Sequence, residues 1–442
     1  MPLTWRLTAF LSILLVSAAT LAQGSVRLGV ETPVESPMGL DSAALRATVF
    51  GTPPNEMAPL PGKVPLAEIN IRLPGAKPVP EVFWFDRRLR VWFSGQRKPA
   101  PLVIVIAGTG AAGNNEKIAI LRAALYGAGY HVLTMPSPTF PGFIVSASGT
   151  GVAGDLLQDG QDLYAAVQEI IAHLPSRVRI TEINVLGYSL GGANAAMLKS
   201  IDATEGRLHI HRAVMINPPV NLFATLARFD QLFATSIGTG EQDIERLYRK
   251  YYARLANVYR ASNSLEVDEK FLFSAAPDVL ATDAELAAAI ALYYRLSMMD
   301  MFFAGDLFSG AGVVVDPGHP PQVGQAIDEA ARILRSKPLS EYLWRVFMPY
   351  YLKHRPGSTV ESLLADNRLD IIGDALRNDP DYYAQTNRDD LILDGRELEW
   401  LQATMGPRIQ VYDHGGHMGN LGARDQVADM LDMLAGRWTG AQ

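Results

Sequence analysis

The sequence contains no cysteine among its 442 residues, and this absence excludes several kinds of site. Disulfide bonds, cysteine nucleophiles, cysteine-ligated zinc and an acyl anchor on an N-terminal cysteine are all ruled out. Without disulfides, the fold depends on its apolar core, which a chain of this length can supply.

Long runs of lysine and arginine are also missing, and the formal net charge is −7. Because binding to nucleic acid requires clustered cations, we expect no nucleic-acid partner. Hydrophobic residues make up 48% of the chain and charged residues only 19%, which indicates a globular protein and argues against disorder.

The N-terminus is predicted to be a cleavable export signal. The stretch "MPLTWRLTAFLSILLVSAATLAQG" has one arginine, an apolar run and then small residues, so residues 1–22 form a signal peptide with cleavage after Ala22. The alternatives are an uncleaved anchor and a buried helix, although the apolar run is short for a spanning helix. We therefore expect a periplasmic or secreted protein with no membrane span after cleavage.

The pattern of apolar residues predicts an α/β fold interrupted by an insertion. Runs rich in Val, Ile and Leu alternate with amphipathic segments over residues 81–220 and again over 366–442, which is typical of a mostly parallel sheet flanked by helices. Residues 221–365 lack this alternation and are predicted to form a helical cap. Residues 23–80 are predicted to be a Pro/Gly-rich extension with short strands such as "EINIRL".

Two local patterns make sharper predictions. The alternation in "EVFWFDRRLRVWFSG" predicts a hairpin of two strands. Thr282 and Glu285 have the spacing of a capping box at the start of the helix "DAELAAAIALYYRLSMMDMFF", and "DIERLYRKYYARLANVY" predicts another helix before it.

The glycine-rich stretch "VIVIAGTGAAGNNEK" follows a predicted strand and either binds the phosphates of a nucleotide or serves another purpose. Its segment Gly108–Gly113 fits G-x-G-x-x-G, the dinucleotide-binding pattern. That site needs an acidic residue at the end of the next strand, and "YHVLTMPSPTFPGF" offers none there. A phosphate-binding P-loop is excluded because no Gly-Lys-Ser/Thr follows.

A second glycine pattern points to a nucleophile. "NVLGYSLGGANAAM" places Gly187, Tyr188, Ser189, Leu190 and Gly191 at a strand-to-helix junction, the G-x-S-x-G nucleophile elbow. Such a turn leaves no room for side chains two residues before and after the serine, exposes its hydroxyl, and directs a helix N-terminus at developing negative charge.

The partners that a serine nucleophile needs follow later in the chain. "VYDHGGHMGN" offers His417 on a glycine-rich turn after the last strand, with His414 as the competing candidate base. "TNRDDLIL" offers Asp389 and Asp390 as the orienting acid. No spacing indicates a metal site; His209 and His211 alternate along a predicted strand, as packing or edge residues would.

The motifs "GYSLGG", "NRDDLIL" and "GGHMGN" resemble those of the α/β-hydrolase superfamily of serine esterases and lipases, over residues 80–220 and 366–442. The order Ser, Asp, His is also that of the family. The resemblance implies Asp390 as the acid, with Asp389 second, and an oxyanion hole built from the N–H of Thr109 or Gly110 together with that of Leu190. The loop at Gly108–Gly113 is then an oxyanion loop.

The sequence thus predicts an exported serine hydrolase that cleaves small acyl esters through Ser189, Asp390 and His417, with no cofactor. Acyl transfer and thioester or amide cleavage would use the same residues, and a non-catalytic cell-envelope binding protein would keep only the fold. Aromatic and methionine residues of the cap either line the acyl pocket or form the cap's own core: Tyr293, Tyr294, Met298, Met299, Met301, Phe302 and Phe303.

Overall fold

The computed structural model describes residues 40–440 apart from 75–76, 241, 248 and 250–281. The expected signal peptide at residues 1–22 and most of the helix expected at residues 243–259 lie outside the described residues.

A single eight-stranded sheet forms the centre of the molecule, in the order β1-β2-β4-β3-β5-β6-β7-β8. The pairs β1–β2 and β2–β4 are antiparallel, and all other neighbours are parallel. The chain therefore has the α/β-hydrolase fold that its motifs predicted. The strands are β1 Ala67–Ile71, β2 Leu89–Ser94, β3 Ala100–Ile106, β4 His131–Met135, β5 Ile180–Tyr188, β6 Ile210–Ile216, β7 Tyr382–Asn387 and β8 Ile409–Tyr412.

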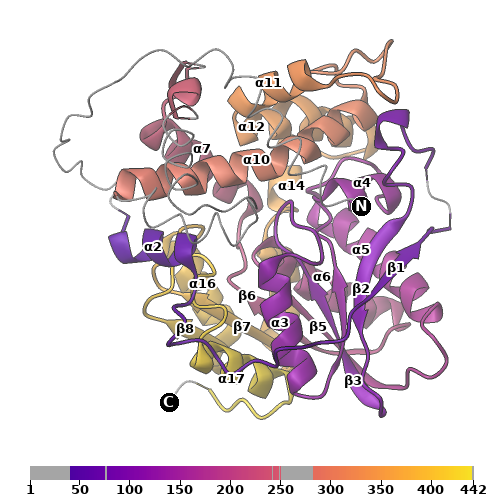
Figure 1. The fold of residues 1–442 in the computed structure, drawn as a ribbon, viewed down its shortest axis with the longest axis vertical. Helices are drawn as coiled ribbons and strands as arrows, with labels where there is room; N and C mark the ends of the chain where they lie inside the picture. Colours follow the sequence, from indigo (N-terminus) through magenta and orange to yellow (C-terminus); the bar gives the residue numbers. More distant parts are fainter. Residues whose placement is uncertain (1–39, 75–76, 241, 248, 250–281, 441–442) are drawn as a thin grey trace, which may run out of the picture.

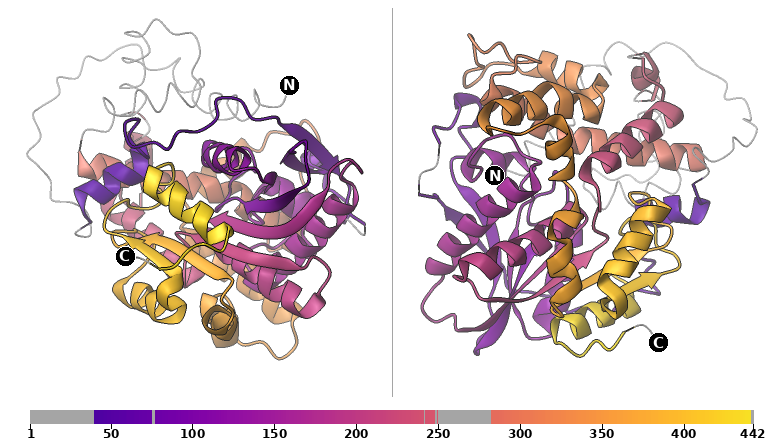
Figure 2. Two further views of the ribbon diagram at one scale, coloured as in Figure 1. Left: turned by 90° about the horizontal axis from the view of Figure 1, so that it is seen from below. Right: turned by 180° about the vertical axis from the view of Figure 1, so that it is seen from behind.

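Helices cover both faces of the sheet, as the buried strands β3 to β6 require. On one face α3 (Glu116–Gly127) and α17 (Arg424–Leu434) pack against the sheet, and on the other lie α5 (Leu156–Ala172), α6 (Leu190–Glu205) and α16 (Gly395–Met405). The view from below separates these two layers (Figure 2). Shorter elements connect them: α4 Pro141–Ser146, α15 Gly373–Asn378, and the single turns η2 Glu81–Phe83, η4 Leu369–Ile372 and η5 Gly406–Arg408.

Further helices are inserted between β6 and β7 and lie above the sheet in Figure 1. We call these the inserted helices: α7 Leu222–Ser236, α10 Asp283–Ser309, α11 Asp328–Ser336, α12 Leu339–Tyr342, the π turn η3 Leu343–Phe347, α13 Met348–His354 and α14 Val360–Ala365. They share one apolar cluster with each other and with residues of the core below them.

Helix α10 is the longest described helix and begins with the predicted capping box between Thr282 and Glu285. By length and composition alone it could cross a membrane, but most of its apolar stretch is buried inside the protein, as in the core helix of a soluble domain. Its apolar character is explained by packing against α7, α2 and α11.

The hairpin predicted from "EVFWFDRRLRVWFSG" is wrong. Only its second half forms a strand, β2, while residues 81–83 form the turn η2. The antiparallel partner of β2 is β1, from the "EINIRL" stretch, with Ile69 opposite Val91. Apolar alternation predicted extended structure there but could not identify the partner strand.

Helix α2 (Ser42–Phe50), within the extension for which only short strands were predicted, packs against α10. The side chain of Asp41 caps its N-terminus by accepting from the Ala43 N–H, and the hydroxyl of Ser42 donates to the Asp283 carboxylate at 2.7 Å. The extension is therefore tied to the inserted helices.

Candidate active site

Ser189 lies in the sharp turn between β5 and α6 with the backbone angles φ 53° and ψ −131°. A Cβ on Gly187 would lie 1.9 Å from the Gly191 carbonyl oxygen, and a Cβ on Gly191 would lie 2.2 Å from that of Ile106. Both positions therefore require glycine, for the reason that the elbow motif predicted. The N–H of Ser189 donates to the Ile216 carbonyl at 2.8 Å, which fixes the turn to the neighbouring strand β6.

The structure brings the hydroxyl of Ser189 to His417 and His417 to Asp390. The distance from Ser189 Oγ to His417 Nε2 is 3.0 Å, and that from His417 Nδ1 to Asp390 Oδ1 is 2.9 Å. All three residues are buried. Because a carboxylate only accepts, Nδ1 carries the ring proton and Nε2 is left to accept from the serine hydroxyl.

Asp390 is held in place by groups outside the predicted motifs. Its Oδ2 accepts from the Asn217 side-chain amide at 2.7 Å, and its Oδ1 accepts from the Ile392 N–H at 3.1 Å. Asn217 follows β6, has a positive φ of 47°, and donates its backbone N–H to the Gln385 carbonyl. Sequence reasoning missed it because the stretch "MINPP" carries no motif.

Asp389, the alternative acid, does not contact His417. Its carboxylate accepts from the backbone N–H groups of Gly415 and Gly416 at 3.2 and 2.8 Å. Through these two hydrogen bonds, Asp389 holds the turn that carries His417. The competing base His414 is exposed and makes no contact with Ser189 among the described residues.

Helix α2 supports the same turn from its other side. The N–H of His417 donates to Thr48 Oγ1 at 2.9 Å, and the Thr48 hydroxyl donates to the Ala44 carbonyl at 2.7 Å. Thr52 accepts from Gly422 and donates to the Gly419 carbonyl. No pattern in the sequence linked the extension to the site, because contacts across more than 360 residues leave no local signal.

The loop Gly108–Gly113, in which the resemblance predicted an oxyanion hole, lies directly beside Ser189. A Cβ on Gly108 would come within 3.1 Å of Ser189 Cβ, so this glycine allows the loop to approach the elbow. Gly110 donates its N–H to Thr139 Oγ1 at 2.8 Å and is therefore already engaged. No acceptor is recorded within the described part of the chain for the N–H groups of Thr109 and Leu190, and both residues line the pocket that contains Ser189.

That pocket is apolar and lies between the sheet and the inserted helices. Helix α7 and helix α10 supply much of its wall, and Ile392 supplies part of the floor near Asp390. Of the cap residues considered in the sequence, Tyr294, Met298 and Met301 line it, whereas Phe302 and Phe303 are buried in the cluster of the inserted helices. Met299 packs against that cluster, and Tyr293 is exposed. The cap residues therefore divide between the lining of this pocket and the cluster of the inserted helices. The apolar residues of the inserted helices that line the pocket are Leu222, Phe223, Leu226, Phe229, Tyr294, Met298 and Met301.

Tyr294 brings a phenol close to the histidine. Its ring stacks on Phe229, with centroids 3.7 Å apart, and lies 6.3 Å from the His417 ring. Burial, reinforced by the nearby Tyr293 and by the charge of Asp390, raises the pKa of Tyr294 well above its usual value. The phenol therefore stays protonated and neutral at physiological pH.

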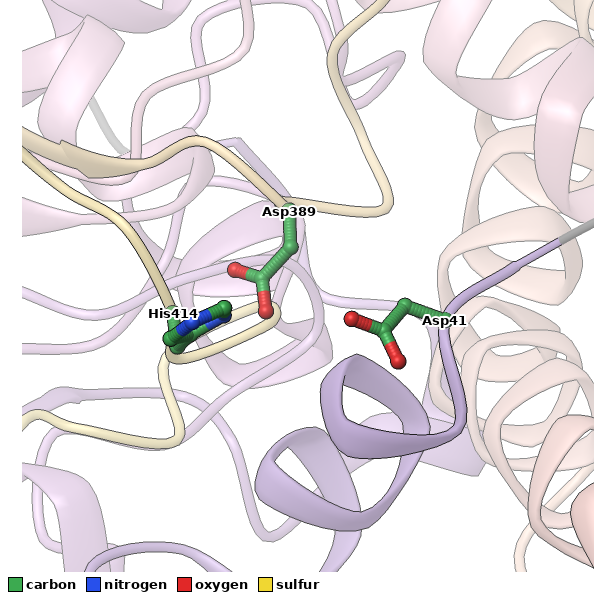
Figure 3. Close-up of side chains that lie close together, drawn as sticks. All are labelled: Asp41, Asp389 and His414. Atoms are coloured by element: carbon green, nitrogen blue, oxygen red, sulfur yellow. The ribbon is translucent and has the colours of Figure 1, made fainter.

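Three side chains beside the His417 turn could offer ligand atoms to a metal ion: Asp41, Asp389 and His414 (Figure 3). Their potential ligand atoms lie within 4.8 Å of one another, but Asp41 and His414 are exposed. Both carboxylates already accept backbone hydrogen bonds, so their positions are explained without an ion. We assign no metal to this group.

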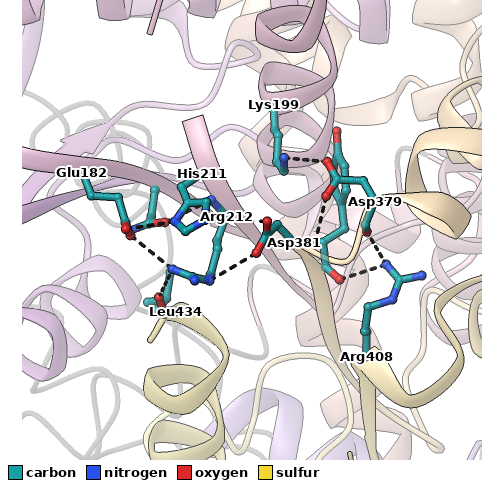
Figure 4. Close-up of polar contacts among 10 residues, drawn as sticks. Glu182, Lys199, His211, Arg212, Asp379, Asp381, Arg408 and Leu434 are labelled. Atoms are coloured by element: carbon teal, nitrogen blue, oxygen red, sulfur yellow. Dashed lines mark hydrogen bonds and ion pairs between the residues drawn. The ribbon is translucent and has the colours of Figure 1, made fainter. Parts of the chain in front are cut away.

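His209 and His211 lie away from the pocket. His209 precedes β6 with a φ of 52° and is exposed, so the two residues do not alternate along one strand as predicted. His211 lies 2.9 Å from Glu182 and 3.7 Å from Asp381, in a network of ion pairs at the amino ends of β6 and β7 (Figure 4). His211 therefore takes part in ion pairs at the amino ends of these strands, away from Ser189.

No protein-family model and no curated protein matches the sequence. Among solved structures, the chain is similar to the α/β hydrolase GrgF from Penicillium sp. sh18, with 12% identity, a TM-score of 0.43, and coverage of 85% of this chain and 99% of that one. It is also similar to an esterase from Pyrococcus furiosus, with 14% identity, a TM-score of 0.39 and coverage of 85% and 94%. A thioesterase domain from the curacin biosynthetic pathway has 12% identity, a TM-score of 0.38 and coverage of 84% and 99%. At such low identity these similarities concern the fold alone.

Proposed function

We propose that this chain is an exported serine hydrolase that cleaves carboxylic esters through a covalent acyl-enzyme. The observation that carries the proposal is the continuous set of contacts from Ser189 through His417 to Asp390, at 3.0 and 2.9 Å, inside an apolar pocket. A hydroxyl, an imidazole and a carboxylate in this order form the arrangement that activates a serine for attack on an acyl carbon.

In the proposed reaction, Ser189 Oγ attacks the acyl carbon while its proton passes to His417 Nε2. Asp390 stabilises the imidazolium that results, and the N–H groups of Thr109 and Leu190 donate to the oxygen of the tetrahedral intermediate. The proton on His417 then goes to the departing alcohol. A water molecule, deprotonated by the same imidazole, attacks the acyl-enzyme and releases the carboxylic acid and free Ser189.

The ester substrate is favoured by the surroundings of the serine. The pocket lining is predominantly apolar, which suits an uncharged acyl group. Thioester or amide cleavage and acyl transfer need the same three residues, so a comparison of matched oxygen ester, thioester and amide substrates decides among them. Alcohol added as a competing acceptor separates transfer from hydrolysis.

Labelling with a fluorophosphonate probe tests the nucleophile. The wild-type protein should be labelled, and Ser189→Ala should lose labelling and reduce kcat for p-nitrophenyl esters by about 10⁴-fold or more, with an unchanged melting temperature. Ser336→Ala, at the end of α11, is the matched control and should be labelled like the wild type. Labelling that persists in Ser189→Ala would refute Ser189 as the nucleophile. A folded wild type that neither reacts with the probe nor hydrolyses any ester would favour a non-catalytic binding protein.

The export part of the proposal rests on residues 1–22. N-terminal sequencing of the protein recovered from the periplasm or the medium should begin at Gln23. Recovery of an intact N-terminus in the membrane fraction would indicate an anchor in place of a cleaved signal.

A further inference from the structure

A short turn at the start of β2 presents two aromatic side chains and two arginines to solvent. Trp84 is 55% exposed and Phe85 is 50% exposed, and Arg87 and Arg88 are exposed as well. We call residues 84–88 the aromatic–arginine turn. Adjacent large aromatic side chains that remain half exposed contribute little to the core, and such surfaces mark interaction sites.

The turn is held firmly by the residues between and beside the exposed ones. Phe83 is buried and packs edge-to-face on Phe303 of α10, with ring centroids 5.8 Å apart. Asp86 is buried, pairs with Arg90 at 3.1 Å, and donates its N–H to the Phe83 carbonyl. The exposed aromatics are therefore presented by a fixed backbone and are not the end of a loose loop.

The register of the sheet places this turn on the same edge as the candidate active site. Trp92 pairs with Thr134 and Ser94 with Val132 in an antiparallel pair, so β2 begins beside the carboxyl end of β4, and β4 runs parallel to β3. Ser189 follows the carboxyl end of β5 at that edge. The contact of Phe83 with α10 further places the turn next to the inserted helices that cover the pocket.

The local charge is opposite to that of the whole chain. The net charge is −7, yet Arg87 and Arg88 form no ion pair with any described carboxylate, and the carboxylate of Asp86 is already paired with Arg90. Glu81 is the one other acidic residue between positions 80 and 90. Aromatic side chains partition to the boundary between lipid headgroups and acyl chains, and arginines beside them attract anionic headgroups.

We propose that the aromatic–arginine turn docks the protein on an anionic lipid bilayer. Trp84 and Phe85 enter the interfacial region, while Arg87 and Arg88 contact lipid phosphates. The docked orientation turns the carboxyl edge of the sheet toward the membrane, and, if the proposed function holds, the ester substrate is drawn from that surface. Binding itself does not depend on catalysis and can be measured with Ser189→Ala.

Vesicle sedimentation of the secreted protein tests the proposal. Phosphatidylcholine vesicles are compared with vesicles in which about a third of the lipid is phosphatidylglycerol. We expect the wild type to bind the anionic vesicles more strongly than the neutral ones. On anionic vesicles, Trp84→Ser/Phe85→Ser should lower the binding affinity by about tenfold or more. Arg87→Gln/Arg88→Gln should lower it by about fivefold per arginine, and this loss of affinity should disappear on neutral vesicles. Trp344→Ser removes an equally exposed tryptophan from the inserted helices and should bind as the wild type does.

Three outcomes would overturn the proposal. In the first, the wild type binds neither kind of vesicle, and in the second, Trp344→Ser loses as much binding as Trp84→Ser/Phe85→Ser. In the third, the wild type binds no vesicles and is a dimer that Trp84→Ser/Phe85→Ser converts to a monomer, which would identify the turn as a protein contact. Turnover of a soluble short-chain ester should be unchanged in all these variants, so failure of docking is distinguished from failure of the proposed hydrolase function.

Discussion

Thr48 connects helix α2 to the His417 turn through one hydrogen bond. Its hydroxyl oxygen accepts the N–H of His417, and the neighbouring Gly416 packs so closely on α2 that a Cβ there would lie 2.2 Å from the Ala44 carbonyl oxygen. Thr48 is thus a positioning residue, because it contacts the backbone of His417 and not the pocket. The precision of the Ser189–His417 contact depends on such support.

Replacing Thr48 with valine keeps the shape of the side chain and removes the acceptor. The buried N–H of His417 then loses its partner, at a cost of about 1–3 kcal/mol. We expect kcat for a soluble ester to fall about tenfold with KM nearly unchanged, since a small displacement of the base slows the chemical step more than binding. Thr48→Ser retains the hydroxyl and should restore kcat; a Thr48→Val variant with wild-type kcat would contradict the assigned role.

At the scale of elements, buried carboxylates fix the connections between helices and strands. Asp202, near the end of α6, accepts from the Tyr164 hydroxyl of α5 at 2.7 Å and from the N–H groups of Leu208 and Ile210, which lead into β6. Burial acts to raise the pKa of Asp202, but these hydrogen bonds together outweigh it, so the pKa is lowered. The ionised carboxylate therefore stabilises the α6–β6 junction.

A lowered pKa in the folded state predicts a specific dependence on pH. The stabilisation by Asp202 is present above the unfolded-state pKa of about 4 and is lost as the pH falls through the lower folded value. Asp202→Asn should lower the free energy of unfolding in urea by about 1–3 kcal/mol at pH 7, and the difference from the wild type should shrink at pH 3. An equal difference at both values of pH would show that the charge is not what stabilises the junction.

The pKa of Asp159 in α5 is shifted in the opposite direction, so this residue serves as a control for Asp202. Burial raises its pKa well above the usual value, against one hydrogen bond from the Gly154 N–H. The wild type should therefore lose stability as the pH rises above about 4 through the raised pKa. Asp159→Asn can still accept from Gly154 and should not show that loss, so its stability relative to the wild type should increase between pH 4 and pH 8.

At the scale of the whole molecule, residues of the α/β core and of the inserted helices together form the pocket. Ser189, Thr109 and Leu190 come from the core, whereas Phe229 and Met298 come from the inserted helices. Gly110, in the loop beside Ser189, packs against the backbone of α10, where a Cβ on this glycine would lie 2.3 Å from the Ser297 carbonyl oxygen. The inserted helices therefore define both the cover of the serine and the wall that an acyl chain would meet.

Shortening a pocket side chain should change the preferred acyl length. Met298→Ala enlarges the pocket beside Tyr294, and we expect the ratio of kcat/KM for octanoyl over acetyl esters to increase about tenfold. Met299→Ala changes the next residue of α10, which does not line this pocket, and is the matched control. A chain-length profile that shifts equally in both variants would mean that α10 as a whole has moved. Thermal melts accompany both, because removing a buried methionine destabilises the fold.

The alternation of strands and helices in the sequence predicted most of the observed elements. Strands β2 to β8 and helices α3, α5, α6, α16 and α17 lie within residues 81–220 and 366–442, where apolar alternation predicted a sheet flanked by helices, and α10 begins at the predicted capping box. These signals are local. The hairpin at residues 81–95 was predicted wrongly and α2 was not predicted, since strand pairing and helix docking depend on distant segments. The pairing of β1 with β2 and the packing of α2 on α10 are set by the tertiary structure.

The sequence by itself determined which residues could act: the glycines of the elbow, Ser189, His417, the pair Asp389 and Asp390, and the loop that begins at Gly108. The glycines and Ser189 follow from the backbone geometry of the elbow motif, whereas the other residues follow from their positions after predicted strands and from the resemblance of their motifs to those of α/β hydrolases. Tertiary structure decided that Asp390 faces His417 while Asp389 faces backbone N–H groups, and that Gly110 is already engaged. It also brought Thr48 and Asn217 to the site through hydrogen bonds that join residues 369 and 173 positions apart in the chain. Such contacts are set by how the layers pack, which no local pattern encodes.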